Sequence, residues 1–468
     1  THVPPLPVPS ERTLYTARWV LPISAPAMED GAVLVSGDTI AWVGPAHAAG
    51  EEISAHGAEP VSVVALGDAV LLPGLVNAHS HLELTTLRGF LEGLDFREWL
   101  RTLTAVRRDL LTEADLLDAS RVGIVEALRH GITTLADCTD SAMPLHAMRE
   151  LGVRGIGYVE LFGPDPAQRD ESLSRLRARV ELLRQQDTPL VRTGVSPHAP
   201  YTVSASLFRA TATYALAERL PMAVHVAESA AETAFVCTGE GPFAERLRAR
   251  GMAVAPQARS PVALLEATGV LAVRPLLIHA VRVDEADLQR IAHHGASIVH
   301  CPISNAKLGQ GLAPLDRMQA HGIAVGLGTD SVASNDRMHL IDEARQAILA
   351  HAIRSGSPDS LSAHGALELA TAGGAAALGL EAVVGTLEVG KAADLAAFPL
   401  DDATVHTVHD PAVTLVHALA GRAQATLVTV GGRVLVRGGQ VLVDDPTWHV
   451  RQRETGARLR QWRQRGAP

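Results

Sequence analysis

Residues 74–83 read Gly-Leu-Val-Asn-Ala-His-Ser-His-Leu-Glu, and this stretch decides how the rest of the chain is interpreted. It follows the apolar residues 69–72 and a Pro-Gly step. Side chains repeat every two residues along a β-strand, so a strand that ends here places His79 and His81 on one face. Neutral imidazole is the commonest metal ligand, and two on one strand face supply half of a metal site. The alternative is a pair of structural histidines, and residues downstream decide between the two.

The composition is that of a globular protein with a large core. The 468 residues are 47% apolar and 20% charged, and the formal charge of -10 argues against nucleic-acid binding as the main function. No apolar run is long enough to span a membrane. Three cysteines lie far apart and predict no disulfide framework. Residues 1–12 lack the basic and then apolar order of a signal peptide, so we expect a cytoplasmic protein.

Short apolar strands alternate with longer helical segments after residue 69. We expect strands at residues 70–78, 132–138, 154–162, 192–197, 221–227, 275–280, 296–301 and 323–329. Helical apolar spacing occurs at residues 113–130, 171–186 and 204–219. Eight strand–helix units in about 300 residues predict an α/β fold, the (β/α)8 TIM barrel. A doubly wound open sheet is the alternative, but no Gly-rich dinucleotide turn follows the first strand.

Both ends of the chain have the pattern of β structure. Residues 13–65 contain two apolar runs around a Gly-Asp turn, which predicts a hairpin, and residues 385–443 again alternate apolar and polar positions. The last residues are rich in arginine and predict a helix, which either binds a polyanion or packs one face on the protein. The predicted domains are a small β-sandwich from 1–68 and 385–445, a barrel at 69–384 and a helical tail at 446–468.

Polar residues that suit metal chemistry follow several of the predicted strands. His79 and His81 end the first strand, His225 ends the fifth and Asp330 follows the eighth. Catalytic groups of a TIM barrel come from the carboxyl ends of its strands, so these side chains should converge. Three imidazoles and one carboxylate suit Zn²⁺ or Fe²⁺, with one position left for water. Further candidates at the same rim are His198, Glu228, His279, His300 and Asn305.

The chain resembles the amidohydrolase superfamily, in particular its mononuclear aminohydrolase branch. The matching stretches are residues 74–83, 196–201, 225–229, 304–308, 328–335 and 385–394. That branch includes adenosine, S-adenosylhomocysteine, methylthioadenosine, guanine and aminodeoxyfutalosine deaminases and the triazine chlorohydrolases. The resemblance implies a barrel flanked by a β-sandwich that both chain ends form, which agrees with the pattern above.

The scarcity of lysine indicates a mononuclear rather than a binuclear amidohydrolase. Binuclear amidohydrolases commonly bridge two metals with a carboxylated lysine on the fourth strand. The chain has only Lys307, beyond the seventh strand, and Lys391, in the expected sandwich. We therefore expect one divalent metal per chain, Zn²⁺ before Fe²⁺ or Mn²⁺. Its expected ligands are His79, His81, His225 and Asp330.

The resemblance also implies roles in the reaction. The metal makes hydroxide from its bound water near neutral pH. Asp330 would take the water proton, His279 would orient that water, and Glu228 would protonate the ring nitrogen beside the reacting carbon. The alternative for Glu228 is a support that fixes His225.

Several polar residues are candidates for contact with the substrate. His198 resembles the substrate-contact histidine of nucleoside deaminases, although flanking prolines also suit a core histidine. Glu83, two residues past His81, could reach a ribose hydroxyl. Glu160 ends the third strand and faces the same rim. A structural role is the alternative for both acids.

Arginine is the expected partner of a substrate carboxylate, because lysine is almost absent. Arg88 and Arg154 are the candidates nearest predicted strand ends, and helix capping is the alternative for Arg88. Carboxylate-bearing nucleosides should then be better substrates than adenosine, and Arg88→Met should narrow the difference. Trp99 could stack on a base or pack in the core. Lys307 and Asn305 should fix the loop after the seventh strand.

We expect a hydrolase of carbon–nitrogen bonds that deaminates an aminopurine nucleoside at C6 and releases ammonia. The substrate that we expect first is 6-aminodeoxyfutalosine, an intermediate of the alternative menaquinone route, because residues 79–83 resemble the aminodeoxyfutalosine deaminases. S-adenosylhomocysteine, methylthioadenosine and adenosine come next, and a chlorohydrolase or cyclic amide hydrolase is a different reaction at the same site. An inactive scaffold fits poorly, because all metal and catalytic positions are present. The expected partner is a small molecule, with a homodimer left open and neither nucleic acid nor membrane involved.

Overall fold

The computed structural model describes residues 12–465 except 56–59, 95, 402, 404 and 406. The start of the predicted sandwich at 1–11 and the end of the predicted tail at 466–468 lie outside the described residues. Among the described helices, none is long and apolar enough to cross a membrane.

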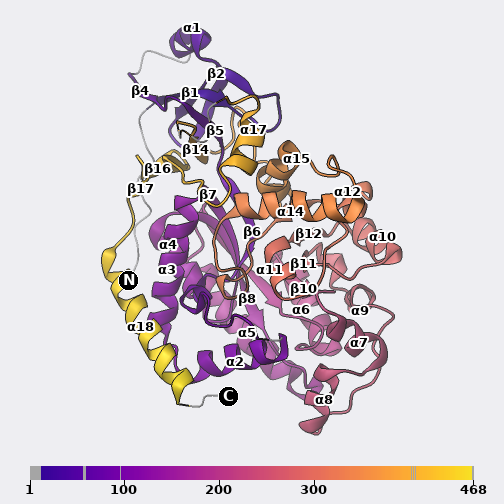
Figure 1. Ribbon diagram of the computed structural model, residues 1–468. Coiled ribbons are helices and arrows are strands. Elements are labelled where there is room, and N and C mark those ends of the chain that lie inside the picture. Colours follow the sequence, from indigo (N-terminus) through magenta and orange to yellow (C-terminus); the bar gives the residue numbers. More distant parts are fainter. Residues whose placement is uncertain are drawn as a thin grey trace.

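The centre of the molecule is a barrel of parallel strands (Figure 1). Its strands are β6 (Leu75–Ser80), β7 (Ile132–Thr139), β8 (Arg154–Leu161), β9 (Val191–Pro197), β10 (Ala223–Val226), β11 (Leu276–His279), β12 (Ser297–His300) and β13 (Val325–Leu327). They form two sheets in chain order, β6 to β9 and β10 to β13. Single parallel bridges, Ser80 with Asp330 and Val195 with Met222, join the two sheets into a ring. The predicted TIM barrel is confirmed.

Alternate side chains of the barrel strands enter two different cores, as the period of a strand requires. Val76, Ala78 and Ile278 pack with one another in the barrel interior. Leu75 and Val159 point outward into the larger core between the strands and the surrounding helices. The strands are buried on both faces, which explains why their sequences read as continuous apolar runs.

Helices follow most barrel strands and cover the outside of the ring. The three predicted helices are present as α3 (Glu113–Arg129), α5 (Arg169–Arg184) and α6 (Ala205–Glu218). Thr112 begins α3 with a capping box to Asp115, and Ser204 caps α6. The other α-helices are α1 (Ala49–Ala55), α2 (Phe96–Asp109), α4 (Met143–Leu151), α7 (Ala230–Thr238), α8 (Pro242–Ala249), α9 (Pro261–Ala267), α10 (Glu285–His294), α11 (Pro302–Lys307), α12 (Leu315–Ala320), α13 (Val332–Asn335), α14 (Leu340–Ser355), α15 (Ala363–Glu368), α16 (Gly374–Ala377), α17 (Pro411–Val413) and α18 (Pro446–Gln464).

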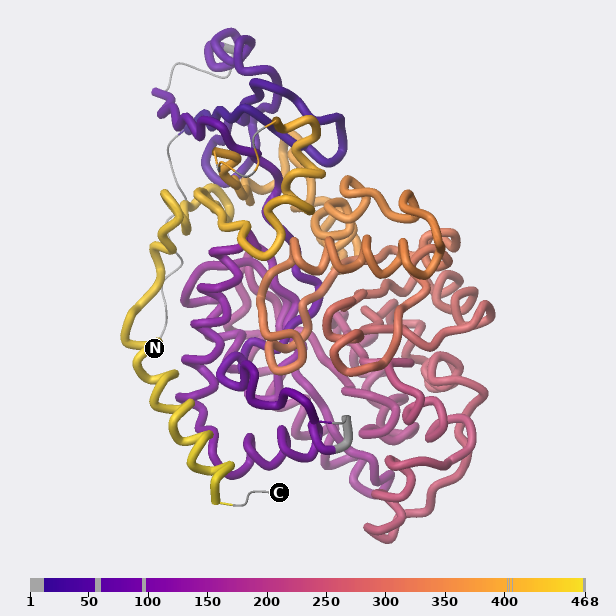
Figure 2. Tube along the Cα trace, in the orientation of Figure 1, coloured from indigo at the N-terminus to yellow at the C-terminus, as the bar shows by residue number. Residues whose placement is uncertain are grey.

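Both chain ends form one mixed sheet at one end of the barrel, as predicted (Figure 2). The strands from the first end are β1 (Arg12–Val20), β2 (Met28–Ser36), β3 (Thr39–Pro45), β4 (Val61–Ala65) and β5 (Ala69–Pro73). Those from the second end are β14 (Leu395–Pro399), β15 (Leu427–Val430), β16 (Arg433–Arg437) and β17 (Gln440–Val441). β5 and β14 pair antiparallel and join the two halves, while β2 and β3 form the predicted hairpin around Gly37.

The predicted first barrel strand, residues 70–78, is two strands in the structure. β5 belongs to the mixed sheet, and only β6 belongs to the barrel, so residues 69–73 of the predicted barrel domain lie in the sheet. Pro73 has no N–H group to donate to a barrel neighbour. A Cβ on Gly74 would lie 2.2 Å from Oγ1 of Thr133, so only glycine fits between the two strands.

Arg154 and Asp394 form a buried ion pair between the barrel and the mixed sheet. The guanidinium donates from Nε to Oδ2 at 2.8 Å and from Nη2 to Oδ1 at 2.9 Å. Oδ1 also accepts from the backbone N–H of Gly431 at 2.7 Å. Arg154 is the first residue of β8, so it lies at the amino end of the barrel, opposite the rim where the predicted ligands converge.

Helix α18 lies along α3 and the turn of 3₁₀-helix η2 (Leu82–Leu87) (Figure 1). Trp448 and Leu459 are buried, while Arg451 pairs with Asp118 and Arg458 pairs with Asp115 of α3. The arginines of the tail therefore hold the helix on the protein, which is the packed alternative of the two that its sequence left open.

Candidate metal centre and catalytic cavity

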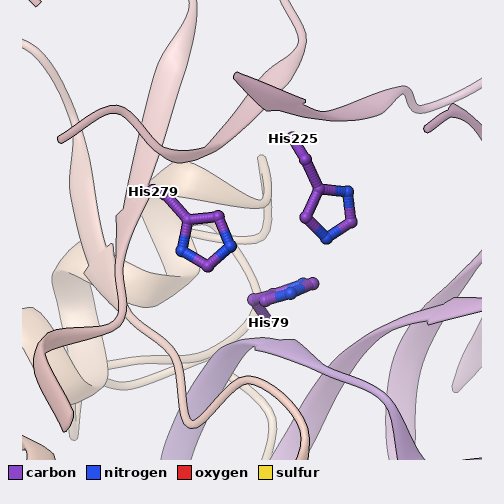
Figure 3. Close-up of side chains that lie close together, drawn as sticks. All are labelled: His79, His225 and His279. Carbon is purple, nitrogen blue, oxygen red and sulfur yellow. The ribbon is translucent and has the colours of Figure 1, made fainter. Parts of the chain in front are cut away.

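The barrel brings His79, His81, His225 and Asp330 together at the carboxyl ends of its strands. Nε2 of His79 lies 3.2 Å, and Nε2 of His81 3.6 Å, from Oδ1 of Asp330. The ring centroid of His225 lies 5.0 Å from that of His79 and 5.5 Å from that of His81. His279 faces the same space, with its ring 5.6 Å from His225 (Figure 3). The side chains predicted to bind the metal thus surround one point.

Hydrogen bonds fix which nitrogen of two imidazoles faces this point. Nδ1 of His81 lies 2.9 Å from the carbonyl of Cys138, and Nδ1 of His225 lies 3.3 Å from the carbonyl of His198. A carbonyl only accepts, so each Nδ1 carries the proton and each Nε2 keeps its lone pair. This is the outer support that metal-binding histidines typically have.

Two serines orient the carboxylate of Asp330. Ser304 Oγ donates to Oδ2 at 2.5 Å, and Ser334 Oγ donates to the same oxygen at 3.1 Å, which leaves Oδ1 toward the histidines. Asp330 and His279 both have left-handed backbones, with φ of 57° and 75°. Such conformations are rare outside glycine and cluster at functional sites.

The protonation states are those that a divalent metal requires. Burial lowers the pKa of His79 to about 4 and also lowers the pKa of His81 and His225, so the imidazoles are neutral. Burial alone would raise the pKa of Asp330, but the neighbouring histidines outweigh it and hold that pKa well below its usual range. The ligand atoms of His79, His81 and Asp330 lie within 4.8 Å of one another, and so do those of His79, His225 and His279. Neutral imidazoles and one carboxylate, in two groups that share His79, fit a single divalent ion.

We expect one divalent metal per chain, released by chelators and lost in the His225→Ala variant. An imidazole contributes a whole ligand, so its removal from a four-ligand site should lower metal affinity at least 100-fold. Elemental analysis of the purified protein measures the stoichiometry. His293→Ala, on α10 away from these residues, is the control. Two tightly held metals per chain would contradict this prediction.

Glu228 lies beside His279 in the turn after β10. Its Oε1 is 3.8 Å from Nε2 of His279, and burial, followed by the charge of Asp330, raises the pKa of Glu228 to about 8. A carboxyl group with this pKa holds a proton at neutral pH and can donate it. The carbonyl of His198 already accepts the hydrogen bond from Nδ1 of His225. Glu228 is therefore not required to orient the His225 ring.

Glu232 positions the turn that carries Glu228, and sequence reasoning missed it. Its carboxylate accepts from the backbone N–H groups of Ala227 at 2.8 Å and Glu228 at 2.9 Å. Ala227 has a left-handed φ of 53°, and the two hydrogen bonds hold this turn. The spacing of Ser229 and Glu232 is a capping-box pattern, which is the signal that could have identified the residue.

A cavity of about 630 Å³ lies over the predicted ligands. Its floor includes His81, His225, Glu228, His279 and Asp330. Most of its wall is apolar and aromatic, as ligand pockets usually are. The aromatic side chains of the wall are Trp99, Phe162, Tyr201 and Phe243.

His198 and Glu160 line this cavity, as expected from their strand ends. Nδ1 of His198 lies 2.8 Å from Oγ1 of Thr202, and that hydroxyl donates to the carbonyl of Ala199. Nδ1 of His198 is therefore the donor, and its Nε2 is an acceptor. Burial lowers the pKa of His198 to about 3 and raises the pKa of Glu160 to about 8. Trp99 also lines the cavity, and its Nε1 donates to Ala333 at 3.3 Å.

Glu83 does not line the cavity. Its side chain is 1% exposed and pairs with Arg107 at 2.6 Å. Its oxygens also accept from Thr139 Oγ1 at 2.9 Å, from the backbone of Asp140 and from the backbone and hydroxyl of Ser141. No lone pair is left for a ribose, so Glu83 ties η2 to the loop after β7.

The two arginines proposed from sequence as carboxylate partners do not line the cavity either. Arg88 pairs with Glu126 at 3.0 Å and donates to the carbonyl of Asp336, and Arg154 is paired at the opposite end of the barrel. The cations that line the cavity are Arg107, Arg108, Arg246 and Arg250. Sequence reasoning missed Arg246 and Arg250 because they lie at a helix between strands, where no motif singles them out.

Both lysines have structural partners. Lys307 pairs with Glu92 at 2.7 Å and with Asp336, which fastens the loop after β12 as expected. Lys391 donates to Thr386 at 2.6 Å and lies beside the mixed sheet. Asn305 is a buried residue of α11, and its backbone carbonyl accepts the backbone N–H of Gln310 at 2.9 Å.

Comparisons with known proteins agree with this architecture. The Amidohydrolase family matches residues 70–435. The 5-methylthioadenosine/S-adenosylhomocysteine deaminase of Desulforudis audaxviator is 33% identical over 457 residues, 96% of this chain and 98% of the relative. The protein of the same name from Nitratidesulfovibrio vulgaris is 35% identical over 424 residues, 88% of this chain and 89% of the relative.

Solved structures with the same fold include zinc-bound enzymes. An adenosine deaminase from Xanthomonas campestris with bound zinc has a TM-score of 0.84 at 30% identity, and the match covers 97% of this chain and all of that one. The atrazine chlorohydrolase of Arthrobacter aurescens, complexed with zinc, has a TM-score of 0.80 at 26% identity, covering 95% and 100%. The Helicobacter pylori aminofutalosine deaminase has a TM-score of 0.74 at 20% identity, covering 91% and 100%, which shows the fold alone.

The family match and the deaminase-named relatives confirm the enzyme class expected from the sequence, a hydrolase that acts on carbon–nitrogen bonds. The family match extends from the end of the first half of the mixed sheet, through the whole barrel, to the returning strands. The chain belongs to the amidohydrolase family.

Proposed function

We propose that the protein is a metal-dependent deaminase of adenine nucleosides that carry a 5′ substituent. The observation that carries this proposal is the cavity of about 630 Å³, whose floor combines the metal donors with the buried acid Glu228. Cavities of this size hold drug-sized ligands, so a nucleoside with an extension fits in volume.

The expected metal ligands and Glu228 have separate tasks in the removal of an amino group from an aromatic ring. A divalent metal held by His79, His81, His225 and Asp330 would supply hydroxide near neutral pH. Oδ1 of Asp330, which the serines leave unbonded, can take a proton at the point of attack. Glu228 holds its proton in a buried site and can donate it to the ring nitrogen beside the reacting carbon. The same carboxylate can then carry a proton to the departing ammonia.

The comparisons favour methylthioadenosine and S-adenosylhomocysteine over 6-aminodeoxyfutalosine as substrates. Both curated relatives described above are named for methylthioadenosine and S-adenosylhomocysteine. The likeness to aminofutalosine deaminase is 20% identity, so it supports the fold and adds nothing for a role in menaquinone synthesis. We therefore place methylthioadenosine and S-adenosylhomocysteine before 6-aminodeoxyfutalosine as substrates.

A panel of substrates tests the proposal. Adenosine, methylthioadenosine, S-adenosylhomocysteine, 6-aminodeoxyfutalosine, guanine and a chlorotriazine are compared by ultraviolet absorbance and ammonia release. We expect the highest kcat/KM for a 5′-extended adenine nucleoside. Turnover of guanine or the chlorotriazine alone would reject the nucleoside assignment.

Arg246 and Arg250 replace Arg88 as the proposed partners of a substrate carboxylate. Both line the cavity, both are exposed, and neither pairs with another residue of the described ranges. S-adenosylhomocysteine has a carboxylate that methylthioadenosine lacks, so the ratio of their kcat/KM values reports this contact. An arginine–carboxylate contact at an open site is worth about a tenfold change.

We expect the double variant Arg246→Met, Arg250→Met to lower the S-adenosylhomocysteine to methylthioadenosine ratio about tenfold, mainly through KM of the former. Arg88→Met is the matched control and should leave the ratio unchanged, because Arg88 lies outside the cavity. A ratio that falls in Arg88→Met and not in the double variant would contradict this assignment.

A further inference from the structure

Glu160 is a buried acid in the cavity wall that the chemistry above does not use. It lies near the end of β8, and its side chain is 7% exposed. Oε1 of Glu160 is buried without a hydrogen-bond partner, and the side chain forms no ion pair with any other residue in the described part of the chain. Native proteins rarely leave a buried carboxyl oxygen unbonded, so its expected partner is a ligand in the cavity.

Arg107 does not serve as that partner. Arg107 lies beside Glu160, but its guanidinium pairs with Glu83 at 2.6 Å and with Asp140 at 3.4 Å. Arg107 therefore holds the loop after β7, and it leaves Oε1 of Glu160 without a hydrogen-bond partner.

Barrel order separates Glu160 from Glu228 by one strand, because Glu160 lies near the end of β8 and Glu228 follows β10. The ligand atoms of Glu160, His198 and His225 lie within 4.8 Å of one another, and these residues follow the adjacent strands β8, β9 and β10. His279 and Glu228 lie on the other side of His225, toward β11. A substrate that contacts both acids therefore has Glu160 on its β8 side and Glu228 on its β11 side.

We propose that Glu160 accepts a hydrogen bond from a ribose hydroxyl of the substrate and so distinguishes a nucleoside from a free base. This inference rests on the proposed function. In adenine, C6 and N1 form one end of the purine, and N9 with its sugar lies at the opposite end. With N1 at Glu228, the sugar lies on the side of β8. A carboxyl oxygen accepts a hydrogen bond whether or not the group is protonated, so a hydroxyl donor fits Glu160 in either state.

The test compares adenosine with 2′-deoxyadenosine and 3′-deoxyadenosine, on the metal-loaded wild type and three variants. The wild type should prefer adenosine to at least one deoxynucleoside by about ten- to a hundredfold in kcat/KM. Glu160→Met has similar length and no acceptor, and it should bring that ratio close to one. Glu160→Gln keeps an acceptor oxygen and should retain most of the preference. Glu181→Met, on the exposed face of α5, is the control, and its ratio of kcat/KM for adenosine to that for the deoxynucleoside should equal the wild-type ratio.

The outcomes separate this inference from the proposed function. Equal turnover of all three nucleosides by the wild type would overturn the role of Glu160 while the deaminase assignment stands. Parallel losses on all three in Glu160→Met, with metal content retained, would also overturn it. No deamination of any adenine nucleoside by the wild type would overturn the proposed function and this inference with it.

Discussion

Glu228→Gln is expected to lower kcat for deamination by about 10²–10⁴-fold, the usual contribution of a general acid–base group. Glutamine has nearly the same shape but carries no proton that it can give to the ring nitrogen. The metal ligands do not depend on Glu228, because backbone carbonyls support His81 and His225. Activity by ammonia release and metal content by elemental analysis are measured on the same preparations.

The control for this variant is Glu240→Gln, an exposed acid at the end of α7. It should have wild-type activity and metal content. His279→Asn should lose activity to a similar degree, because its ring faces both Glu228 and the metal donors. If Glu228→Gln loses the metal and regains full activity on reconstitution, then Glu228 supports the site and is not its acid.

Asp394→Asn is expected to lower the free energy of unfolding by about 3–5 kcal/mol, because it leaves the Arg154 guanidinium buried without its counter-charge. The side chains of this pair are 7% and 1% exposed, so water cannot replace the lost carboxylate. The denaturant midpoint of the variant relative to the wild type measures the change.

An exposed ion pair of the same type supplies the control. Arg18 and Asp68 are 3.2 Å apart with side chains about 40% exposed, and Asp68→Asn should cost less than about 1 kcal/mol. The double variant Arg154→Met, Asp394→Leu removes both charges and should recover much of the loss. Equal shifts in Asp394→Asn and Asp68→Asn would show that the pair between barrel and sheet is not buried in solution.

The convergence of the proposed metal ligands could be predicted from the sequence, because one rule places them. His79, His225 and Asp330 each end or follow an apolar strand, and in a parallel barrel all carboxyl ends of strands share one rim. The rule needs no knowledge of side-chain contacts. It therefore also placed Glu160, His198 and Glu228 in the cavity.

Charged residues near strands were harder to assign, because their role depends on which end of the strand they occupy and on partners far along the chain. Arg154 begins β8 and pairs with Asp394 across the junction with the mixed sheet, so it lies at the wrong end of the barrel for substrate. Glu83 lies close to His81 in sequence, yet Arg107 and the loop after β7 occupy its oxygens.

The boundary between the mixed sheet and the barrel could not be predicted from the sequence, for a different reason. Residues 69–80 are apolar almost throughout, because both β5 and β6 are buried on both faces. Hydrophobic pattern alone cannot divide such a run. The division depends on the missing N–H of Pro73 and on the close approach of Gly74 to Thr133, and the second of these is a contact between distant residues.

The packing of α18 has a consequence for how the protein is made. Leu84 and Trp99, which line the cavity, share an apolar cluster with Leu459 and Trp462 of α18. During synthesis every barrel strand leaves the ribosome before that helix does. The nascent barrel therefore emerges with this apolar surface and the acids of α3 uncovered, and they stay uncovered until translation reaches α18.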